Sequence, residues 1–452
     1  MSAPELTSRL LTNQLQHAES FNAEMGLALA ILVLAYILIF TEVMHRAYAA
    51  LLGAVVMVML GGWAGFYSQE SAILAIDGNT MFLLMSMMML VAMLRPTGAF
   101  EYLGIRLAKL AKGSPSLLLI YLCAAVSVLS MFLDNVTTVI IFAPLTVLMT
   151  RMLNLNPAPF LISQAMMSNI GGTSTLVGDP PNIMIGSAAN IDFVTFLIHM
   201  GPLILPVWLF VMGLLLFLFR QELKPVDVAA VVDLDENKAI QDWPALKRIV
   251  SVLAGVIILF FLHHTLHWYP AFVSLIGLAL ALAWLRPDPE KLMTKVEWSV
   301  LLFFAGLFVL VGGVEASGLL DLVGAQLAAF ASEPGHLLAT ALLLMWVAAL
   351  LSAIIDNIPF TVTMIPIVAA LEQQGVNVTP LWWALAIGVG LGGNGTHIGA
   401  TANLICIAEA DRSRLPEARI TPARWMKAGL PVMFGSLSVA SAVFALFFTA
   451  FS

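Results

Sequence analysis

The chain has 452 residues, of which 60% are hydrophobic and only 10% are charged. A soluble globular protein has about 45–50% apolar and about 25% charged residues, so this composition excludes an ordinary soluble domain. The formal net charge of −7 says little about partners, because the placement of charge matters more than its sum in a membrane protein. We therefore expect an integral membrane protein whose surroundings are the lipid bilayer and which has no nucleic-acid partner.

Long uncharged stretches follow one another along the chain. Each is long enough to cross a bilayer as a helix, because about 17–25 apolar residues suffice. The polar N-terminal segment 1–24 contains Glu5, Glu19 and Glu24 and does not fit a cleaved signal peptide, so the first span is expected from about residue 25. Ten crossings are expected near residues 25–41, 47–66, 78–94, 160–190, 194–219, 248–267, 270–285, 298–314, 380–408 and 428–450.

Two further apolar segments, 116–150 and 337–371, are each divided by an aspartate. We interpret them as re-entrant hairpins that return to the side from which they enter. All but one of the 20 Lys and Arg residues then lie on one side, which the positive-inside rule makes cytoplasmic. Both termini are expected on the external side of the cell inner membrane. Treating either hairpin as a full crossing would invert every later loop and remove this charge bias.

The chain also contains a duplicated unit. Residues 127–146 resemble residues 349–368, and residues 171–178 (GGTSTLVG) are echoed by residues 392–399 (GGNGTHIG). The offset in numbering is 222 for the first pair (349 − 127) and 221 for the second (392 − 171). The nearly constant offset indicates that one ancestral unit was duplicated.

Two amphipathic stretches suggest how the copies are oriented. Residues 98–112 carry three basic residues and residues 318–332 carry none, as expected if the copies face opposite sides of the membrane. The predicted fold class is an all-α membrane protein with inverted-topology repeats, two hairpins and two broken helices, and its substrate site is expected at the repeat interface. The predicted divisions are a first repeat at 25–220 (scaffold 25–94, transport part 116–220), a cytoplasmic linker at 221–247 and a second repeat at 248–452 (scaffold 248–314, transport part 337–452).

Four polar interruptions at bilayer depth are the expected functional positions, because polar groups persist there only around a cavity or a partner. Two are the hairpin tips, which begin at Asp134 and Asp356. Their Asp, Asn and Thr side chains can present oxygens to a solute, or they can simply cap the helix that follows. The other two are 168–182 and 390–403, where glycines and prolines should break a span into two half-helices. The alternative there is a kinked span that packs small residues against a neighbour.

From these interruptions we predict the site residues. Asp134, Asp179 and Asp356 are the candidates for binding a coupling proton or cation, because a carboxylate can alternate between a protonated and a cation-bound state. The alternative is that each only caps a helix. The candidates for binding the substrate are Asn135, Thr137, Thr138, Gly172, Thr173, Ser174, Thr175, Asn182, Asn357, Thr361, Asn394, Thr396, His397 and Asn403.

Metal binding and enzymatic chemistry are poorly supported by the sequence. His263, His264 and His267 have metal-ligand spacing, but they adjoin Trp268 and Tyr269 and fit an interfacial aromatic belt better. The methionines between residues 81 and 93 are interpreted as packing residues. Only two cysteines occur, both in apolar surroundings, so no thiolate cluster is expected. We expect a transporter that is not an enzyme and has no cofactor.

Two segments carry a resemblance to a known family. LDNVTTVIIFAPLT at 133–146 and SNIGGTSTLVGDPPNIMIGS at 168–187 resemble the arsenite-permease and P-protein (pink-eyed dilution) branch of the ion transporter superfamily. The resemblance extends from about residue 25 to the end of the chain. It implies a scaffold that forms a homodimer, a transport domain that moves as an elevator, and a cytoplasmic ATPase subunit as a further partner. In sodium-dicarboxylate relatives the tips read Ser-Asn-Thr, and the acidic tips of this chain argue against a dicarboxylate.

The predicted function is efflux of arsenite or antimonite coupled to inward proton movement. A neutral trihydroxy solute suits a site of amides, hydroxyls and backbone groups, which both donate and accept hydrogen bonds. Sodium/proton exchange is compatible with the same carboxylates and stays open as an alternative. Transport of chloride or another inorganic anion, including through a channel, is a further alternative.

Overall fold

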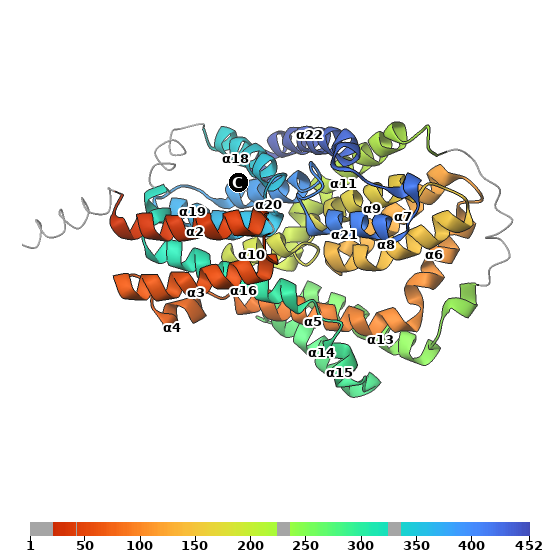
Figure 1. Cartoon of the computed structure of the whole chain (residues 1–452), viewed down its shortest axis with the longest axis horizontal. Coiled ribbons are helices and arrows are strands. Elements are labelled where there is room, and N and C mark those ends of the chain that lie inside the picture. The colour runs from red at the N-terminus through yellow and green to blue at the C-terminus, as the bar shows by residue number, and fades with distance from the viewer. Residues whose placement is uncertain (1–20, 42, 224–235, 324–335) are drawn as a thin grey trace, which may run out of the picture. The chain divides into compact units, whose positions relative to one another are not determined.

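The computed structural model describes residues 21–41, 43–223, 236–323 and 336–452 (Figure 1). These residues form helices and no strand, and they include eight helices that are long and apolar enough to cross a membrane. The predictions for residues 1–20, for part of the linker (224–235) and for most of the second amphipathic stretch (324–332) lie outside the described residues. The number of crossings and their direction stay predictions.

The chain separates into two compact units. The first contains the described parts of Met1–Asp77, Trp298–Thr340 and Val362–Val378, and the second contains the described parts of Gly78–Glu297, Ala341–Thr361 and Thr379–Ser452. In the first unit, α3 packs against both α2 and α16. Its helices are α2 (Ala23–Thr41), α3 (Arg46–Ala64), the short α4 (Gln69–Leu74) and α16 (Trp298–Ala316).

Small residues allow the close packing in the first unit. A Cβ atom at Gly53 of α3 would lie 2.8 Å from the Cβ atom of Ala35 in α2. One at Gly306 of α16 would lie 2.8 Å from the carbonyl carbon of Ala50 in α3. Glycine at these positions therefore lets the helices approach closely, as is common between membrane helices.

The second unit contains the parts of the chain in which the site was predicted. Two hairpins are present, α7–α8 and α18–α19, and two helices are broken, α9/α10 and α20/α21, which confirms the predicted hairpins and breaks. Helices α18 and α19 contribute residues to both units. The bounds of the eight elements are α7 Pro115–Ser130, α8 Asn135–Met152, α9 Pro157–Gly172, α10 Pro180–Ala188, α18 Leu337–Ser352, α19 Asn357–Gln373, α20 Thr379–Gly392 and α21 Thr401–Arg412.

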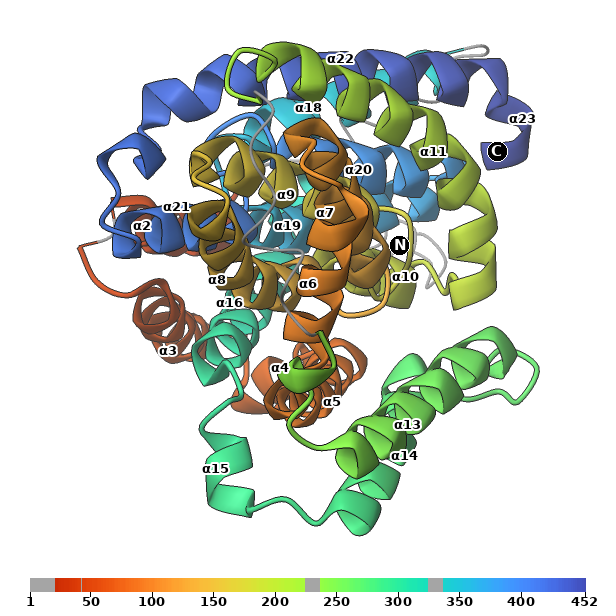
Figure 2. The same cartoon turned by 90° about the vertical axis from the view of Figure 1, so that its right-hand side faces the viewer.

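Other helices of the second unit flank these elements. Helices α11 and α22 lie along each other, and α14 packs against both α5 and α13 (Figures 1 and 2). The bounds are α5 Gly78–Leu94, α6 Ala99–Leu110, α11 Phe193–Leu218, α13 Trp243–Leu262, α14 Pro270–Leu285, α15 Pro289–Met293, α22 Pro422–Leu446 and α23 Phe448–Phe451, with short 3₁₀ turns η1 Arg95–Thr97, η2 Glu236–Ala239 and η3 Pro416–Ala418.

Proline explains where the first broken helix resumes. Pro180 and Pro181 occupy the first turn of α10, where proline is tolerated because the first amides of a helix have no partner within it. A proline also disfavours helical geometry in the residue before it, and Asp179 is accordingly extended, with φ −144° and ψ 132°. In the second repeat Ala400 has nearly the same geometry, φ −147° and ψ 146°, without a following proline. The break is therefore a shared feature of the duplicated fold.

Candidate functional site

The first hairpin tip is built on Asp134. Its Oδ1 atom accepts a hydrogen bond of 2.8 Å from the amide of Thr137, which caps α8, and Thr138 Oγ1 donates to the Asp134 carbonyl at 2.7 Å. The backbone of Asp134 has φ 55° and ψ 153°, a conformation that strongly favours glycine. Asp134 is only 4% exposed. A buried, strained and capping aspartate therefore forms the turn.

The second tip has a matching aspartate with a different set of partners. Asp356 Oδ1 accepts from the amide of Ile358 at 3.4 Å, and Asp356 Oδ2 accepts from Thr401 Oγ1 at 3.0 Å. Thr361 Oγ1 donates to the carbonyl of Asn357, four residues earlier, at 2.7 Å. Thr138 Oγ1 likewise donates to a carbonyl four residues earlier in the first tip, that of Asp134. The second tip is thus tied directly to the first turn of α21.

Two asparagines hold the two break loops in the same way. Asn182 Nδ2 donates to the carbonyls of Gly172 and Thr175, at 3.1 and 2.9 Å. Asn403 Nδ2 makes the equivalent bonds in the second repeat, to the carbonyls of Gly393 and Thr396 at 2.8 and 3.0 Å. Both asparagines were predicted to bind substrate, and the structure shows that their amide nitrogens are already used to shape the loops.

Threonine hydroxyls join each break loop to the hairpin of its own repeat. Thr175 Oγ1 donates to the carbonyl of Met131, and Thr396 Oγ1 donates to the carbonyl of Ala353. The two bonds correspond to each other when the two copies of the repeat are aligned. Together with the asparagine bonds, they make each hairpin and its broken helix one connected polar structure.

The glycines of the break loops are required by close backbone approach. A Cβ atom at Gly171 would lie 2.4 Å from the carbonyl oxygen of Ser127 in α7, and one at Gly392 would lie 2.4 Å from the carbonyl oxygen of Ala349 in α18. A Cβ atom at Gly172 would lie 2.5 Å from the carbonyl oxygen of Gly178. Gly172, which was predicted to bind substrate, therefore has a clear steric role.

The two repeats are linked through Asn169, which the sequence did not single out. Its Oδ1 atom accepts from Asn135 Nδ2 at 3.1 Å, and its Nδ2 atom donates to Asn394 Oδ1 at 3.0 Å and to Asn403 Oδ1 at 3.2 Å. All four side chains are at most 3% exposed. The signal available in the sequence was a Ser-Asn pair one residue before the two glycines at the end of a mainly apolar helix.

Asp179 lies beside this asparagine cluster. The amides of Asn135 and Asn357 approach its carboxyl group, and Asp356 and Asp134 are close enough to interact with it electrostatically. Asp179 is 2% exposed. The structure therefore brings the three predicted carboxylates together, with both hairpin tips close to Asp179. Their part in coupling stays a prediction.

Several buried polar atoms at this place have no hydrogen-bond partner among the described residues. They are Asn135 Oδ1, Asp179 Oδ2, Asn394 Nδ2 and His397 Nδ1. Leaving a buried polar group unsatisfied costs about 1–3 kcal/mol, and such groups are rare in native proteins. All four belong to the hairpin tip or to the break loops, where the sequence predicted substrate and cation binding.

Other predicted substrate residues are engaged within their own elements. Like Thr138 and Thr361, Thr173 turns its hydroxyl to a carbonyl one helical turn earlier, that of Asn169, at 2.8 Å. Ser174 is 6% exposed and lies in the first break loop. Contact of these side chains with a solute stays a prediction.

A cavity of about 760 Å³ reaches the first hairpin tip. Its lining includes Thr137 of the tip, Arg95, Arg248 and Lys295 from segments predicted to be cytoplasmic, and Glu297. Glu297 also interacts electrostatically with Asp134. The cavity therefore reaches from these charged residues as far as Thr137 of the first tip.

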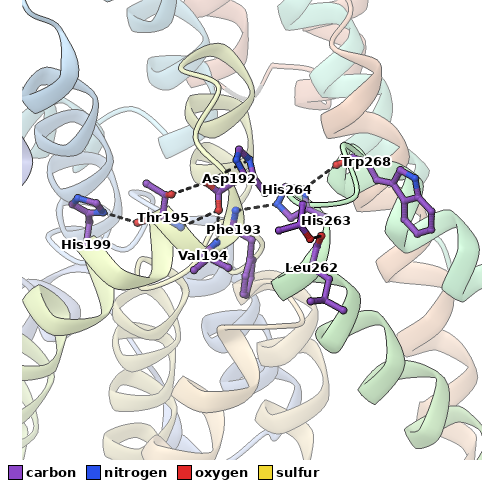
Figure 3. Close-up of polar contacts among 10 residues, drawn as sticks. Asp192, Phe193, Val194, Thr195, His199, Leu262, His263, His264 and Trp268 are labelled. Atoms are coloured by element: carbon purple, nitrogen blue, oxygen red, sulfur yellow. Dashed lines mark hydrogen bonds and ion pairs between the residues drawn. The ribbon is translucent and has the colours of Figure 1, made fainter.

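His263 and His264, two of the three histidines at 263–267, form a structural junction (Figure 3). His263 is buried, its Nε2 atom accepts from the amide of Phe193 at 3.1 Å, and its Nδ1 atom bonds the carbonyl of Trp268 at 2.9 Å. Both ring nitrogens are thus engaged by the backbone and are not available to a metal ion. Within the described ranges, no group of three or more His, Cys, Asp or Glu residues is placed to bind a metal.

Asp192 caps α11 at this junction. Burial alone would raise the pKa of its carboxyl group, but hydrogen bonds from the Thr195 hydroxyl and from the amides of Thr195 and Val194, together with His264, lower the pKa overall. The Nδ1 atom of His264 lies 3.9 Å from Asp192 Oδ2 (Figure 3). A carboxyl group whose pKa is lowered by folding stabilises the fold above its unfolded pKa, and this contribution is lost as the pH falls through the folded pKa.

We therefore predict a pH-dependent effect of Asp192→Ala. Loss of the cap should lower the free energy of unfolding by about 1 kcal/mol at pH 7, the usual cost for this position. The difference from wild type should begin to shrink as the pH falls below about 4, where the carboxyl group of the unfolded protein becomes protonated, and it should vanish below the lower folded pKa. Thermal unfolding in detergent between pH 3.5 and 8 measures this. Asp192→Asn, which keeps a capping oxygen, is the control, and a difference that grows on acidification would contradict the assignment.

Comparison with known proteins identifies the family. The sequence pattern of the family described as CitMHS, citrate transporter, matches residues 36–388, which is more than half of the chain. The chain belongs to the citrate transporter family. Bacterial membrane proteins of similar length are among the relatives of this chain. An uncharacterized transporter of Mycobacterium tuberculosis is 40% identical over 399 residues, covering 86% of this chain and 91% of that protein.

Two further relatives extend the comparison. The 46 kDa membrane protein of Mycobacterium leprae is 39% identical over 400 residues, covering 86% of this chain and 92% of that protein. The P protein of Homo sapiens is 33% identical over 475 residues, covering 87% of this chain but only 57% of the P protein. The expected kinship with the P protein is confirmed, whereas kinship with arsenite permeases in particular stays a prediction.

A solved structure supports the fold. The YdaH transporter of Alcanivorax borkumensis superposes with a TM-score of 0.57 at 15% sequence identity, covering 90% of this chain and 98% of that chain. At this identity the likeness concerns the fold alone. The protein is thus a multi-pass membrane transporter of the citrate transporter family, helical throughout its described residues, and one of its relatives is named as a transporter.

Proposed function

We propose that the protein is a secondary active transporter that moves a small inorganic solute in exchange for a monovalent cation, which binds at the carboxylate cluster. The observation that carries the proposal is the meeting of Asp134, Asp179 and Asp356 with unsatisfied polar atoms of both repeats. Charges are costly at bilayer depth and are typical of ion and proton pathways in transporters. Two inverted repeats that share one polar cluster fit the general arrangement of such proteins.

The cargo that fits the cluster best is a neutral trihydroxy solute, arsenite or antimonite, expelled as protons enter. Asn394 Nδ2 offers a donor, whereas Asn135 Oδ1 and Asp179 Oδ2 offer acceptors, and a hydroxyl group can satisfy either kind. The family is described by citrate, but a free polycarboxylate would meet three carboxylates. Two like charges about 4 Å apart repel by about 4 kcal/mol even at an effective dielectric constant of about 20.

Sodium/proton exchange is a second candidate, and one observation favours it. Two of the unsatisfied atoms, Asp179 Oδ2 and Asn135 Oδ1, are acceptors, and oxygen acceptors alone suffice to bind a hard cation. We further propose, from the family resemblance, that the protein acts as a homodimer in the inner membrane, with an elevator-like movement of the parts that contain the hairpins and broken helices.

A side-by-side flux assay tests the proposal. The purified full-length protein is reconstituted in liposomes, and movement of arsenite, sodium, chloride and citrate is measured with and without an imposed pH gradient. Arsenite flux that requires and follows the pH gradient supports the leading proposal, and sodium flux in exchange for protons supports the second. Chloride flux indifferent to protons, or citrate flux alone, would rule out both.

A further inference from the structure

The first repeat supplies two carboxyl groups to the carboxylate cluster, and the second repeat supplies one. In the alignment that pairs residues 171–178 with residues 392–399, Asp179 corresponds to Ala400. Both residues have the same extended backbone immediately before the second half-helix. The duplicated fold therefore presents a side chain at this point twice, but only the first repeat provides a carboxyl group. By contrast, the hairpin aspartates Asp134 and Asp356 occur in both copies.

The hairpin aspartates are engaged by their own elements. Asp134 Oδ1 accepts from an amide in the first turn of α8, at 2.8 Å. Asp356 accepts from an amide in the first turn of α19 at 3.4 Å and from Thr401 Oγ1 at 3.0 Å. Bonds of this kind are those of helix caps, whose loss costs about 0.5–2 kcal/mol. These two carboxylates therefore have a structural role that does not require a ligand.

Asp179 occupies the equivalent cap position of α10 but makes no side-chain cap hydrogen bond. The sequence explains why. Pro180 and Pro181 have no amide hydrogen to donate, and the amide of Asn182 donates at 2.9 Å to the carbonyl of Asp179 itself. The first turn of α10 therefore offers its side chain no amide, and the carboxyl group is left for another partner.

One oxygen of the Asp179 carboxyl group lacks a hydrogen-bond donor among the described residues. This oxygen, Oδ2, and Asn135 Oδ1 are both buried acceptors without such a partner. Asp179 is 2% and Asn135 3% exposed. The amides of Asn135 and Asn357 approach the carboxyl group but leave Oδ2 without a donor, and a buried carboxylate oxygen of this kind can take up a proton or bind a metal cation. Asn169 Oδ1 accepts a hydrogen bond from Asn135 Nδ2 and so fixes the position of the Asn135 side chain.

We infer that Asp179 alone binds the coupling cation, one per transport cycle, and that Asp134 and Asp356 act as helix caps. The inference rests on the proposed transport function and specifies its site. It has a consequence for charge movement. If sodium and protons compete for this one carboxylate, their exchange is one for one and electroneutral, whereas entry of one proton in exchange for a neutral solute moves one charge.

The test compares three isosteric variants of the full-length protein. Asp179→Asn, Asp134→Asn and Asp356→Asn each remove one charge, and asparagine retains a capping oxygen at the hairpin tips. Each protein is purified in detergent, and binding of ²²Na⁺ is measured at pH 8.5 and after acidification to pH 6. Each is also reconstituted to measure flux driven by a pH gradient or a sodium gradient. Thermal unfolding shows that each variant is folded.

We expect one ²²Na⁺ per wild-type protomer, displaced by acidification, and none in Asp179→Asn. Gradient-driven flux should fall at least 100-fold in Asp179→Asn and at least tenfold less in the two tip variants, which keep a capping oxygen. If wild type binds no ²²Na⁺, the coupling cation is the proton. The proton-driven flux of the three variants then decides whether Asp179 alone binds it. Cation-dependent flux that persists in Asp179→Asn, or that is lost in a folded tip variant, would overturn the inference. A wild type that binds one cation but moves no solute would refute the proposed function while leaving the Asp179 assignment intact.

Discussion

Asn169→Ala is expected to unfold or severely destabilise the protein. The substitution removes three hydrogen bonds at once, to Asn135, Asn394 and Asn403. Hydrogen bonds between membrane helices contribute only about 0.6 kcal/mol each on average, so their loss alone would cost about 2 kcal/mol. The larger cost comes from the buried amide groups that lose their partners, at about 1–3 kcal/mol each. We expect a total loss of about 3 kcal/mol or more.

The measurement is the thermal unfolding of the purified variant, together with its yield of monodisperse protein. Gln373→Ala is the control. It also removes a side-chain amide, but at an exposed position in the last turn of α19 and outside the asparagine cluster. A variant at position 169 as stable as this control would show that the asparagine cluster does not join the two repeats.

Gly171→Ala is the second substitution with a large expected effect. The added methyl group would lie 2.4 Å from the carbonyl oxygen of Ser127 and 2.6 Å from its Cα atom, both backbone atoms of the facing helix α7. A flexible side chain could turn aside, but a helix backbone must move as a whole. Overpacking of this kind costs about 1–3 kcal/mol, and here it would also displace the loop that contains Thr175 and Asp179. We therefore expect lower stability and loss of gradient-driven flux.

A matched glycine in a neighbouring helix provides the control. A Cβ atom at Gly213 of α11 would meet nothing within 4 Å. Alanine is the better helix former by about 1 kcal/mol, so Gly213→Ala should be neutral or slightly stabilising. Equal unfolding temperatures and flux for the two variants would mean that the hairpin and the broken helix do not need to approach so closely.

The hairpins and breaks were predictable because their sequence motifs occur in both copies of the duplicated unit. The repeated Asp-Asn pair marks both tips, the repeated glycines mark both breaks, and the first half-helices begin close to the predicted starts of their segments. The glycines were predictable as helix breakers, but their steric role required knowledge of which backbone faces them. Gly171 faces Ser127 and Gly392 faces Ala349, each in a hairpin arm far earlier in the chain.

The division of roles within the site was not predictable in the same way. Asp134, Asp179 and Asp356 each precede a helix, so sequence position alone suggests a cap for all three. The Pro-Pro pair after Asp179 was the available sign that this carboxylate receives no amide from its helix. Asn169 lies in the last turn of α9, at the start of the predicted break 168–182, and its importance depends on Asn394 and Asn403 in the other repeat, which no local pattern reveals.

Alternate exposure of the first break loop to the two sides of the membrane tests the central claim most directly. The chain has only two cysteines, both buried, so a single reporter can be introduced at Ser174 after they are replaced. If the polar cluster is a transport site, the Ser174→Cys thiol should react with a membrane-impermeant reagent applied from either side, and transported solute should slow both reactions. A thiol that reacts from one side only under every solute and gradient condition, or from neither, would contradict the account.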